Sequence, residues 1–285
     1  MIDYSIYDQP VLPSALPLEN AEHFQLTAAN IEHFTDNGFV VGNGRISAEY
    51  LALLKADLHE LMLPGHVGHE LWYEYHSNES DDPNTILFHA LGAWRLRTSF
   101  HDLLWHPAIT VPAKQLLGTS VRFWHDQLFC KPAHHGGVVA WHQDYSYWSR
   151  TEPMNHLTCW IALEDSTIAN GCINYISGSN HWDLLPITGL TGGMEAIRRV
   201  LTPQQFERFI TPTPVELNAG QMVFHHPLTV HGSFANRTER PRRAAVINLI
   251  GDGVSSGTDD ALLQGVPAVP KGNALNGRFF PLLRG

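Results

Sequence analysis

The hydrophobic pattern of the chain changes its period near Gly118. Before this residue, apolar side chains recur every three to four positions, which is typical of helices that pack one face on a core. After it they alternate, which is typical of strands with one buried face. The predicted helices run from the cap Thr27 to Gly38, from Ser47 to Pro64-Gly65 with Leu51, Leu54, Leu58 and Leu61 on one face, over 107–117, and over 202–210 behind Thr202-Pro203.

Short strands separated by Gly and Asn turns fill most of the chain after Gly118. This layout predicts a mainly β protein with flanking helices, built on a double-stranded β-helix of the jelly-roll or cupin-like type. In the first long strand the alternation places Val121, Phe123, His125, Gln127 and Phe129 on one face. The predicted strands are 39–42, 120–132, 138–144, 156–163, 172–177, 213–217, 221–226, 228–234 and 242–250.

No stretch of linker composition and no internal repeat divides the chain, so we expect a single domain over 1–285. Residues 1–25 are rich in proline and indicate an extended arm, and residues 252–285 indicate a loop-rich tail. The segment 66–106 has no clear period, and its polar part 74–84 has the composition of a loop long enough to form a lid or a binding loop.

Charge and composition exclude several classes of function. The formal net charge is −10, from 28 acidic and 18 basic residues, which disfavours nucleic acid as a partner. No apolar run approaches the length of a membrane span, and the first residues lack the features of a secretory signal. Three cysteines without CxxC spacing suit a reducing compartment, so we expect a cytoplasmic protein, whose oligomeric state the sequence does not indicate.

His142 and Asp144 are the first candidate metal ligands among 18 histidines. On an extended backbone, residues two apart point to the same face, so both side chains can reach one ion. With one more histidine they would form the facial triad of non-haem iron(II) oxygenases, which leaves three coordination positions open. An HxD pair alone is weak evidence in a histidine-rich chain, and a strand-end histidine beside a solvated aspartate is the simpler alternative.

The segment that begins at Gly220 offers the third ligand. His231 precedes a turn after which the chain returns as a strand that starts at Arg242, so a hairpin can bring the guanidinium near the histidine. An arginine there can bind a carboxylate through two hydrogen bonds. Arg243 points to the opposite face of the strand. His225 and His226 are the alternative ligands, but Pro227 interrupts the alternation between them and His231.

These segments resemble the phytanoyl-CoA dioxygenase family of iron(II)- and 2-oxoglutarate-dependent oxygenases over roughly residues 28–250. The resemblance is carried by WHQD at 141–144, WIALEDSTIANGCINYISGSNHW at 160–182 and HGSFANRTERPRRA at 231–244. It implies that His142, Asp144 and His231 bind Fe(II), and that an arginine eleven residues after the last of these, Arg242, binds the distal carboxylate of 2-oxoglutarate. It also implies cosubstrate contacts from Ser233 and Trp160, with O2 as second cosubstrate and ascorbate as a stimulant. Gln127, which shares a strand face with Phe129, is a further candidate for the cosubstrate pocket.

The resemblance further implies oxidation of a small molecule, by hydroxylation or a related reaction such as desaturation, with release of succinate and CO2. Related halogenases have a small residue in place of the aspartate, so Asp144 argues against halogenation. Candidate substrate contacts are Lys131 and the aromatic patch directly after Asp144, which contains Tyr145, Tyr147 and Trp148. Two alternatives remain open: a cupin-like metal-dependent isomerase or hydrolase, and a catalytically idle sensor. The identity of the substrate, the position oxidised and the loop that forms the lid are not readable from the sequence.

Overall fold

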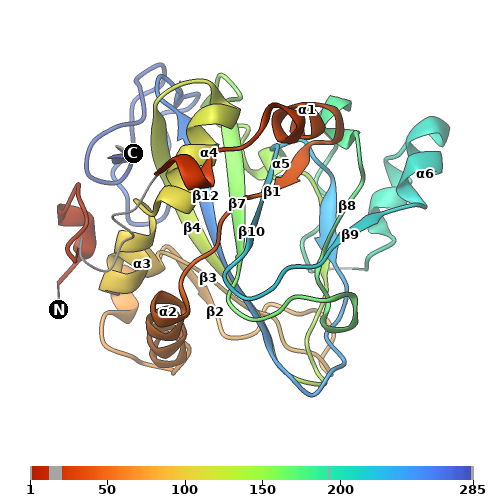
Figure 1. Cartoon of the computed structure of the whole chain (residues 1–285), viewed down its shortest axis with the longest axis horizontal. Coiled ribbons are helices and arrows are strands. Elements are labelled where there is room, and N and C mark those ends of the chain that lie inside the picture. Colours follow the sequence, from red (N-terminus) through yellow and green to blue (C-terminus); the bar gives the residue numbers. More distant parts are fainter. Residues whose placement is uncertain (1, 13–20, 192, 284–285) are drawn as a thin grey trace.

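Two antiparallel sheets face each other in the computed structural model, which describes residues 2–12, 21–191 and 193–283. The large sheet has the strand order β1-β10-β7-β12-β4-β3-β2, with β14 beside β4, and the small sheet has the order β5-β11-β8-β9. In Figure 1 the large sheet stands between the helices α2–α4 and the small sheet. The large sheet contains β1 (Phe39–Val41), β2 (Glu74–His76), β3 (Phe88–Leu91), β4 (Val121–Lys131), β7 (His156–Ala162), β10 (Met222–His225), β12 (Arg242–Gly251) and β14 (Leu282–Leu283); the small sheet contains β5 (Val139–His142), β8 (Ile173–Tyr175), β9 (Thr213–Val215) and β11 (His231–Ser233).

The four predicted helices, α1, α2, α4 and α6, form close to the expected residues, whereas α3 and α5 were not predicted. Thr27 caps α1 through a capping box with Asn30, and Gly38 ends it in the left-handed region at φ 83°. Ser47 accepts a hydrogen bond from the backbone of Tyr50 and caps α2. The α-helices are α1 (Ala28–Asn37), α2 (Ala48–Leu61), α3 (Thr98–Leu103), α4 (Pro107–Leu117), α5 (Tyr145–Trp148) and α6 (Pro203–Phe209).

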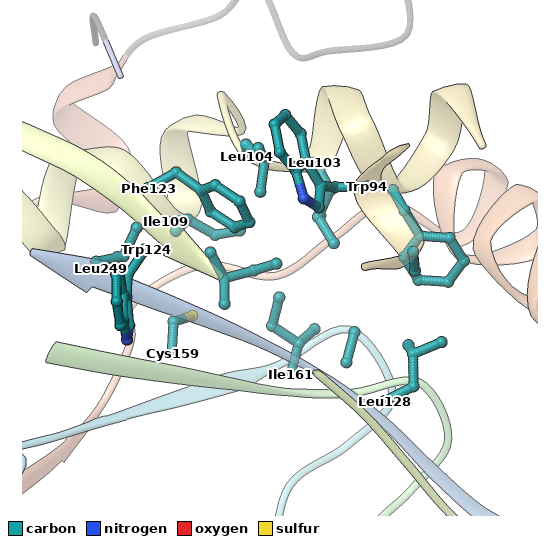
Figure 2. Packing of buried hydrophobic residues seen from close by; sticks show 14 of the residues in the cluster. Trp94, Leu103, Leu104, Ile109, Phe123, Trp124, Leu128, Cys159, Ile161 and Leu249 are labelled. Atoms are coloured by element: carbon teal, nitrogen blue, oxygen red, sulfur yellow. The ribbon is translucent and has the colours of Figure 1, made fainter. Parts of the chain in front are cut away.

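The largest hydrophobic cluster lies between helices α2–α4 and the large sheet. Figure 2 shows side chains such as Leu103, Ile109 and Phe123 filling the space between the helices and the strands. The leucine face predicted for α2 is buried there, since Leu54, Leu58 and Leu61 are 0% exposed. Burying an aliphatic side chain of this kind contributes about 1.5–3 kcal/mol. This packing fixes the large sheet and leaves its other face free to form a site.

A β-bulge interrupts β4, so the alternation predicted for this strand is wrong. On the neighbouring strand β12, Asn248 pairs with His125 but Leu249 pairs with Phe123, so Trp124 is one residue more than the ladder needs. The bulge reverses which side chains face which layer. Val121 and Phe123 therefore pack in the helix-side cluster, whereas His125, Gln127 and Phe129 face the small sheet, and the five do not share one face.

The segment 66–106 contains more regular structure than its composition indicates. Residues 74–76, predicted as part of a loop, form β2, which pairs with β3 at the edge of the large sheet. The turn after β3 is held by Asp126, whose carboxylate accepts hydrogen bonds from the backbone N–H groups of Gly92 and Trp94 at 2.9 and 2.8 Å. Burial raises the pKa of Asp126 to about 7. The segment also contains α3 and two 3₁₀ turns, His69–Leu71 and Ala93–Arg95.

Both ends of the chain contact the core. The arm at the start contains the 3₁₀ turns Tyr4–Ile6 and Ala21–Phe24, and Asp3 binds Arg95 with an Oδ2–Nη2 distance of 2.6 Å. The arm is therefore not wholly extended. In the tail, β13 (Ser255–Ser256) pairs with β6 (Thr151–Glu152), and β14 pairs with β4. Within the described residues, no helix is long and apolar enough to cross a bilayer.

Candidate metal centre and cosubstrate pocket

A cavity of about 390 Å³ opens between the two sheets. Its floor comes from β3, β4, β7, β10 and β12 of the large sheet, and its opposite wall from β5, β8 and β11 of the small sheet. Helix α5, the loops at 187–190 and 262–263, Glu74 of β2, Glu79 and residues 150–151 also contribute to the lining. A volume of this size falls in the range of small-molecule sites. The predicted metal ligands and the predicted arginine all line this one cavity.

His142, Asp144 and His231 converge at one point in the cavity. Their ligand atoms all lie within 4.8 Å of one another. The Nε2 atoms of His142 and His231 are 3.4 and 3.6 Å from Asp144 Oδ1. Pairing of β5 with β11 places the two histidines directly opposite each other across the ladder, which explains how ligands far apart in sequence meet.

Asp144 reaches this point by a route that differs from the predicted one. Strand β5 ends at His142, and Asp144 has helical backbone angles (φ −58°, ψ −41°) as the residue before α5. The two side chains therefore do not share the face of one extended strand. The turn into α5 brings the carboxylate back toward the histidine, and the backbone N–H of Tyr145 donates to Pro227 O at 3.0 Å.

Hydrogen bonds fix both histidines in the form that binds a metal. His142 Nδ1 donates to Ala140 O at 2.8 Å, and His231 Nδ1 donates to Thr229 O at 2.9 Å. With the proton on Nδ1, each Nε2 presents its lone pair to the shared point. Burial, together with the nearby His142 and His225, holds the pKa of His231 well below its usual value, so this imidazole stays neutral. Nitrogen and carboxylate donors in this arrangement suit a divalent transition metal.

The second oxygen of Asp144 is occupied by two donors from the large sheet. Thr158 Oγ1 donates to Oδ2 at 2.6 Å, and His225 Nε2 lies 3.0 Å from the same atom. Burial alone would raise the pKa of Asp144, but the neighbouring His231 and the hydrogen bond from His225 hold it well below its usual value. Oδ2 is thus held by the protein, and Oδ1 faces the Nε2 atoms of His142 and His231.

Arg242 and its neighbours form the second part of the site. The side chain is 1% exposed, and its Nη2 donates to Ser233 Oγ at 3.1 Å. The guanidinium carbon lies 5.4 Å from the centre of the Trp160 ring. Nε of Arg242 has no hydrogen-bond partner in the described part of the chain, and burial lowers the pKa of this arginine to about 10. A buried, incompletely satisfied guanidinium is a site for an anion.

The structure places the remaining predicted residues in different environments. Gln127 and Trp148 line the cavity. Tyr145 is not brought to the cavity lining in the described structure, because its hydroxyl donates to Thr151 O at 2.6 Å and its ring lies against His156. Lys131 is fully buried behind Ser233 and is likewise not part of that lining. Arg243 pairs with Glu164 on the opposite face of β12.

Several residues of the cavity were not predicted from the sequence. His89 on β3 is 4% exposed; its Nδ1 lies 2.5 Å from Glu79 Oε2, and its Nε2 has no partner among the described residues. Tyr147, by contrast, belongs to the predicted aromatic patch after Asp144, and it lines the cavity beside His142, with ring centres 6.0 Å apart. Thr158 could have been found from the alternation of its strand, since it is two residues before Trp160. The pairing of His89 with Glu79 had no sequence signal, because β3 itself was not recognised.

Comparison with known proteins identifies relatives across most of the chain. The family described as phytanoyl-CoA dioxygenase matches residues 34–244. A probable phytanoyl-CoA dioxygenase of Caenorhabditis elegans is 32% identical over 148 residues, covering 49% of this chain and 46% of that protein. The L-proline trans-4-hydroxylase of Streptomyces griseoviridis is 27% identical, covering 58% of this chain and 70% of that protein. The chain spans about half the length of the first of these relatives.

Solved structures share the same architecture. The non-haem α-ketoglutarate-dependent epimerase SnoN from nogalamycin biosynthesis superposes with a TM-score of 0.72 at 25% identity, covering 90% of this chain and 98% of that chain. The carbocyclase SnoK of the same biosynthesis reaches a TM-score of 0.74 at 21% identity, covering 93% and 99%. These likenesses confirm the predicted double-stranded β-helix with flanking helices. Because the family match covers most of its length, the chain belongs to the phytanoyl-CoA dioxygenase family.

Proposed function

We propose that this protein is an Fe(II)- and 2-oxoglutarate-dependent oxygenase of a small molecule. One observation carries the proposal: three converging metal ligands and a buried, incompletely satisfied arginine line the same cavity. A metal site alone would fit an isomerase, a hydrolase or a sensor. The arginine adds a site for a carboxylate in the same cavity, which is what the far end of a 2-oxo diacid requires.

His142, Asp144 and His231 would hold the metal, each through one atom. Ferrous iron held by these residues would supply the oxidation chemistry, in which dioxygen is consumed, 2-oxoglutarate is converted to succinate and CO2, and the substrate is oxidised. The protein's own contribution is geometric. Thr158 and His225 fix the carboxylate of Asp144, and the backbone carbonyls behind the two histidines fix the rings.

The distal carboxylate of the cosubstrate would bind between Arg242 and Ser233. The Trp160 ring contacts the guanidinium and limits its freedom, so fewer conformations are lost on binding. Val246 and Ile173 line the apolar part of this pocket, and Gln127 adds an amide. Burial keeps water from competing for the ion pair, which strengthens it.

The substrate would occupy the rest of the cavity. Tyr147, Trp148, Leu262 and Leu263 supply an aromatic and aliphatic wall, and Glu79 with His89 supplies a polar one. Two walls of this kind suit a small molecule that has both an apolar body and a polar group. With Asp144 as a ligand, hydroxylation or another C–H oxidation is favoured over halogenation. Three buried, free cysteines suit a reducing compartment, and we propose the cytoplasm.

The test is succinate formation from 2-oxoglutarate by the purified protein with ferrous iron, oxygen and ascorbate, across a library of metabolites. We expect a slow basal rate that a particular metabolite increases. An isomerase or hydrolase would change its substrate without forming succinate, and an idle sensor would bind 2-oxoglutarate without consuming it. His142→Ala is the matched control, because it removes a metal ligand and should abolish both rates.

A further inference from the structure

Lys131 is fully buried at the end of β4 and contacts β11 rather than solvent. Its Nζ donates to Ser233 Oγ at 2.7 Å, to Ser233 O at 3.1 Å and to Phe234 O at 2.6 Å. An ammonium group has three N–H donors, and here each meets an oxygen. Lysine is rarely buried in this way, and the three contacts show that its position is specific.

The contacts around Ser233 determine what its hydroxyl can do. Its oxygen accepts from Lys131 Nζ at 2.7 Å and from Arg242 Nη2 at 3.1 Å. A hydroxyl oxygen has two lone pairs, and two cationic donors use both of them. The hydroxyl hydrogen is then left as a donor with neither cation able to accept it. Ser233 lines the cavity, so this hydrogen is available to an acceptor there.

The positive charges of Lys131 and Arg242 indicate that the acceptor of this hydrogen is an anion. Lys131 and Arg242 pair directly across β4 and β12, and neither forms an ion pair with a carboxylate in the described residues. Burial, together with the charge of Arg242, holds the pKa of Lys131 well below its usual value. Two buried cations side by side repel each other, and an anion bound beside them would relieve this cost.

We propose that Lys131 is a positioning residue for the distal carboxylate of 2-oxoglutarate, acting through the hydroxyl of Ser233. Lys131 occupies one lone pair of the serine oxygen and thereby directs the hydroxyl hydrogen toward the carboxylate that Arg242 binds. This inference rests on the proposed function, since it assumes that Arg242 receives that carboxylate. Lys131 itself touches neither cosubstrate nor metal.

The experiment measures binding rather than turnover. Isothermal titration calorimetry without oxygen compares 2-oxoglutarate with 2-oxobutanoate on the Mn(II)-loaded protein. Both ligands have the 2-oxo acid that chelates a metal, but only 2-oxoglutarate has the distal carboxylate. We expect Lys131→Met to weaken 2-oxoglutarate binding about ten- to a hundredfold, the usual range for a charge-assisted hydrogen bond, and to leave 2-oxobutanoate and Mn(II) binding unchanged. Lys114→Met, at an exposed position of α4, is the matched control and should change neither.

A double-mutant cycle separates positioning from general damage. If Lys131 acts through the serine hydroxyl, adding Lys131→Met to Ser233→Ala should cost far less than Lys131→Met costs alone. Additive effects, or equal weakening of both ligands, would overturn the proposal. If Lys131→Met does not fold, Ser233→Ala still tests the hydroxyl: it must weaken 2-oxoglutarate and spare 2-oxobutanoate. The Arg242→Ala variant distinguishes failure of the proposed function from failure of this inference. If Arg242→Ala does not weaken 2-oxoglutarate binding, the proposed function is refuted. If Arg242→Ala weakens binding but Lys131→Met does not, only the inference about Lys131 is refuted.

Discussion

His225 Nε2 lies 3.0 Å from Asp144 Oδ2, and the hydroxyl of Tyr175 lies 2.9 Å from the other nitrogen of the same ring. Burial holds the pKa of Tyr175 well above its usual value, so the phenol keeps its proton and can donate it to Nδ1. Nε2 then carries the imidazole hydrogen and donates it to the carboxylate. A nitrogen that donates a hydrogen has no lone pair for a metal, so the hydrogen bonds place His225 as a support for the candidate ligand Asp144.

Substitution of these histidines should therefore separate two roles. His231→Ala should abolish tight Fe(II) or Mn(II) binding, as should His142→Ala and Asp144→Ala. The His225→Ala variant should still bind the metal, but with an affinity about ten- to a hundredfold lower, which is the usual effect of removing a group that orients a ligand. His226→Ala, at the neighbouring position, is the control. Metal titration with circular dichroism as a check on folding is the measurement, and the assignment is wrong if His225→Ala abolishes binding while His231→Ala does not.

The two adjacent arginines of β12 should behave differently. Arg242→Ala should raise the 2-oxoglutarate requirement about thirty-fold to several-thousand-fold, because truncating one partner of a buried ion pair costs about 2–5 kcal/mol. Arg242→Lys should recover part of this loss, since an ammonium lacks the planar fork. Arg243→Ala should change the requirement little, because that side chain binds Glu164 on the other face. Titration of succinate formation measures all three, and similar effects at both positions would remove Arg242 from the cosubstrate site.

Halide should not enter the product. With chloride present and a substrate identified, mass spectrometry should find hydroxylated or desaturated product from the wild-type protein, because Asp144 occupies the position that a halide would need. A parallel reaction in bromide controls for traces of chlorinated contaminants. Detection of a halogenated product would contradict the role given to Asp144.

Removing the contact between the N-terminal arm and the core should lower stability in a pH-dependent way. Burial opposes ionisation of Asp3, but its bonds to Arg95 and Ser5 outweigh this and lower its pKa from 3.8 to about 2. A lowered carboxyl pKa contributes stability above the unfolded value, and this contribution is lost as the pH falls through the folded value. Asp3→Asn should therefore lower the free energy of unfolding by about 1 kcal/mol at neutral pH, after allowance for contact with water.

Urea unfolding from pH 7 down to pH 2 measures this difference. The gap between wild type and Asp3→Asn should be constant above about pH 4 and should close toward pH 2. Asp8→Asn, at an exposed position in the same arm, should show no gap at any pH. A gap that persists unchanged at pH 2 would mean that the ion pair is not its source.

The helices α1, α2, α4 and α6 could be predicted from the sequence because their ends depend on local contacts, whereas the set of candidate metal ligands came from motifs that resemble a known family. Thr27, Gly38 and Ser47 determine helix ends through contacts within a few residues. The environment of Lys131 could not be predicted, since its three acceptors belong to Ser233 and Phe234, about a hundred positions away. Strand β3 was missed for a similar reason, because its pairing with β4 rather than its composition makes it a strand. Tertiary contacts of this kind leave little trace in a single sequence.

The extra residue at Trp124 has a consequence for how this chain can change. Upstream of it, alternate side chains of β4 serve the helix layer, and downstream the parity is exchanged, so Leu128 and Cys130 take over that task. The alternation of side chains between the two faces of β4 therefore changes phase at the bulge. Deleting one residue at the bulge would turn Gln127 and Phe129 toward the hydrophobic cluster under the helices and would turn Leu128 toward the cavity. Substitutions at Gln127 or Phe129 can therefore alter which molecules fit the cavity, whereas Leu128 and Cys130, which alternate with them on the same half of the strand, must stay apolar to hold the helices in place.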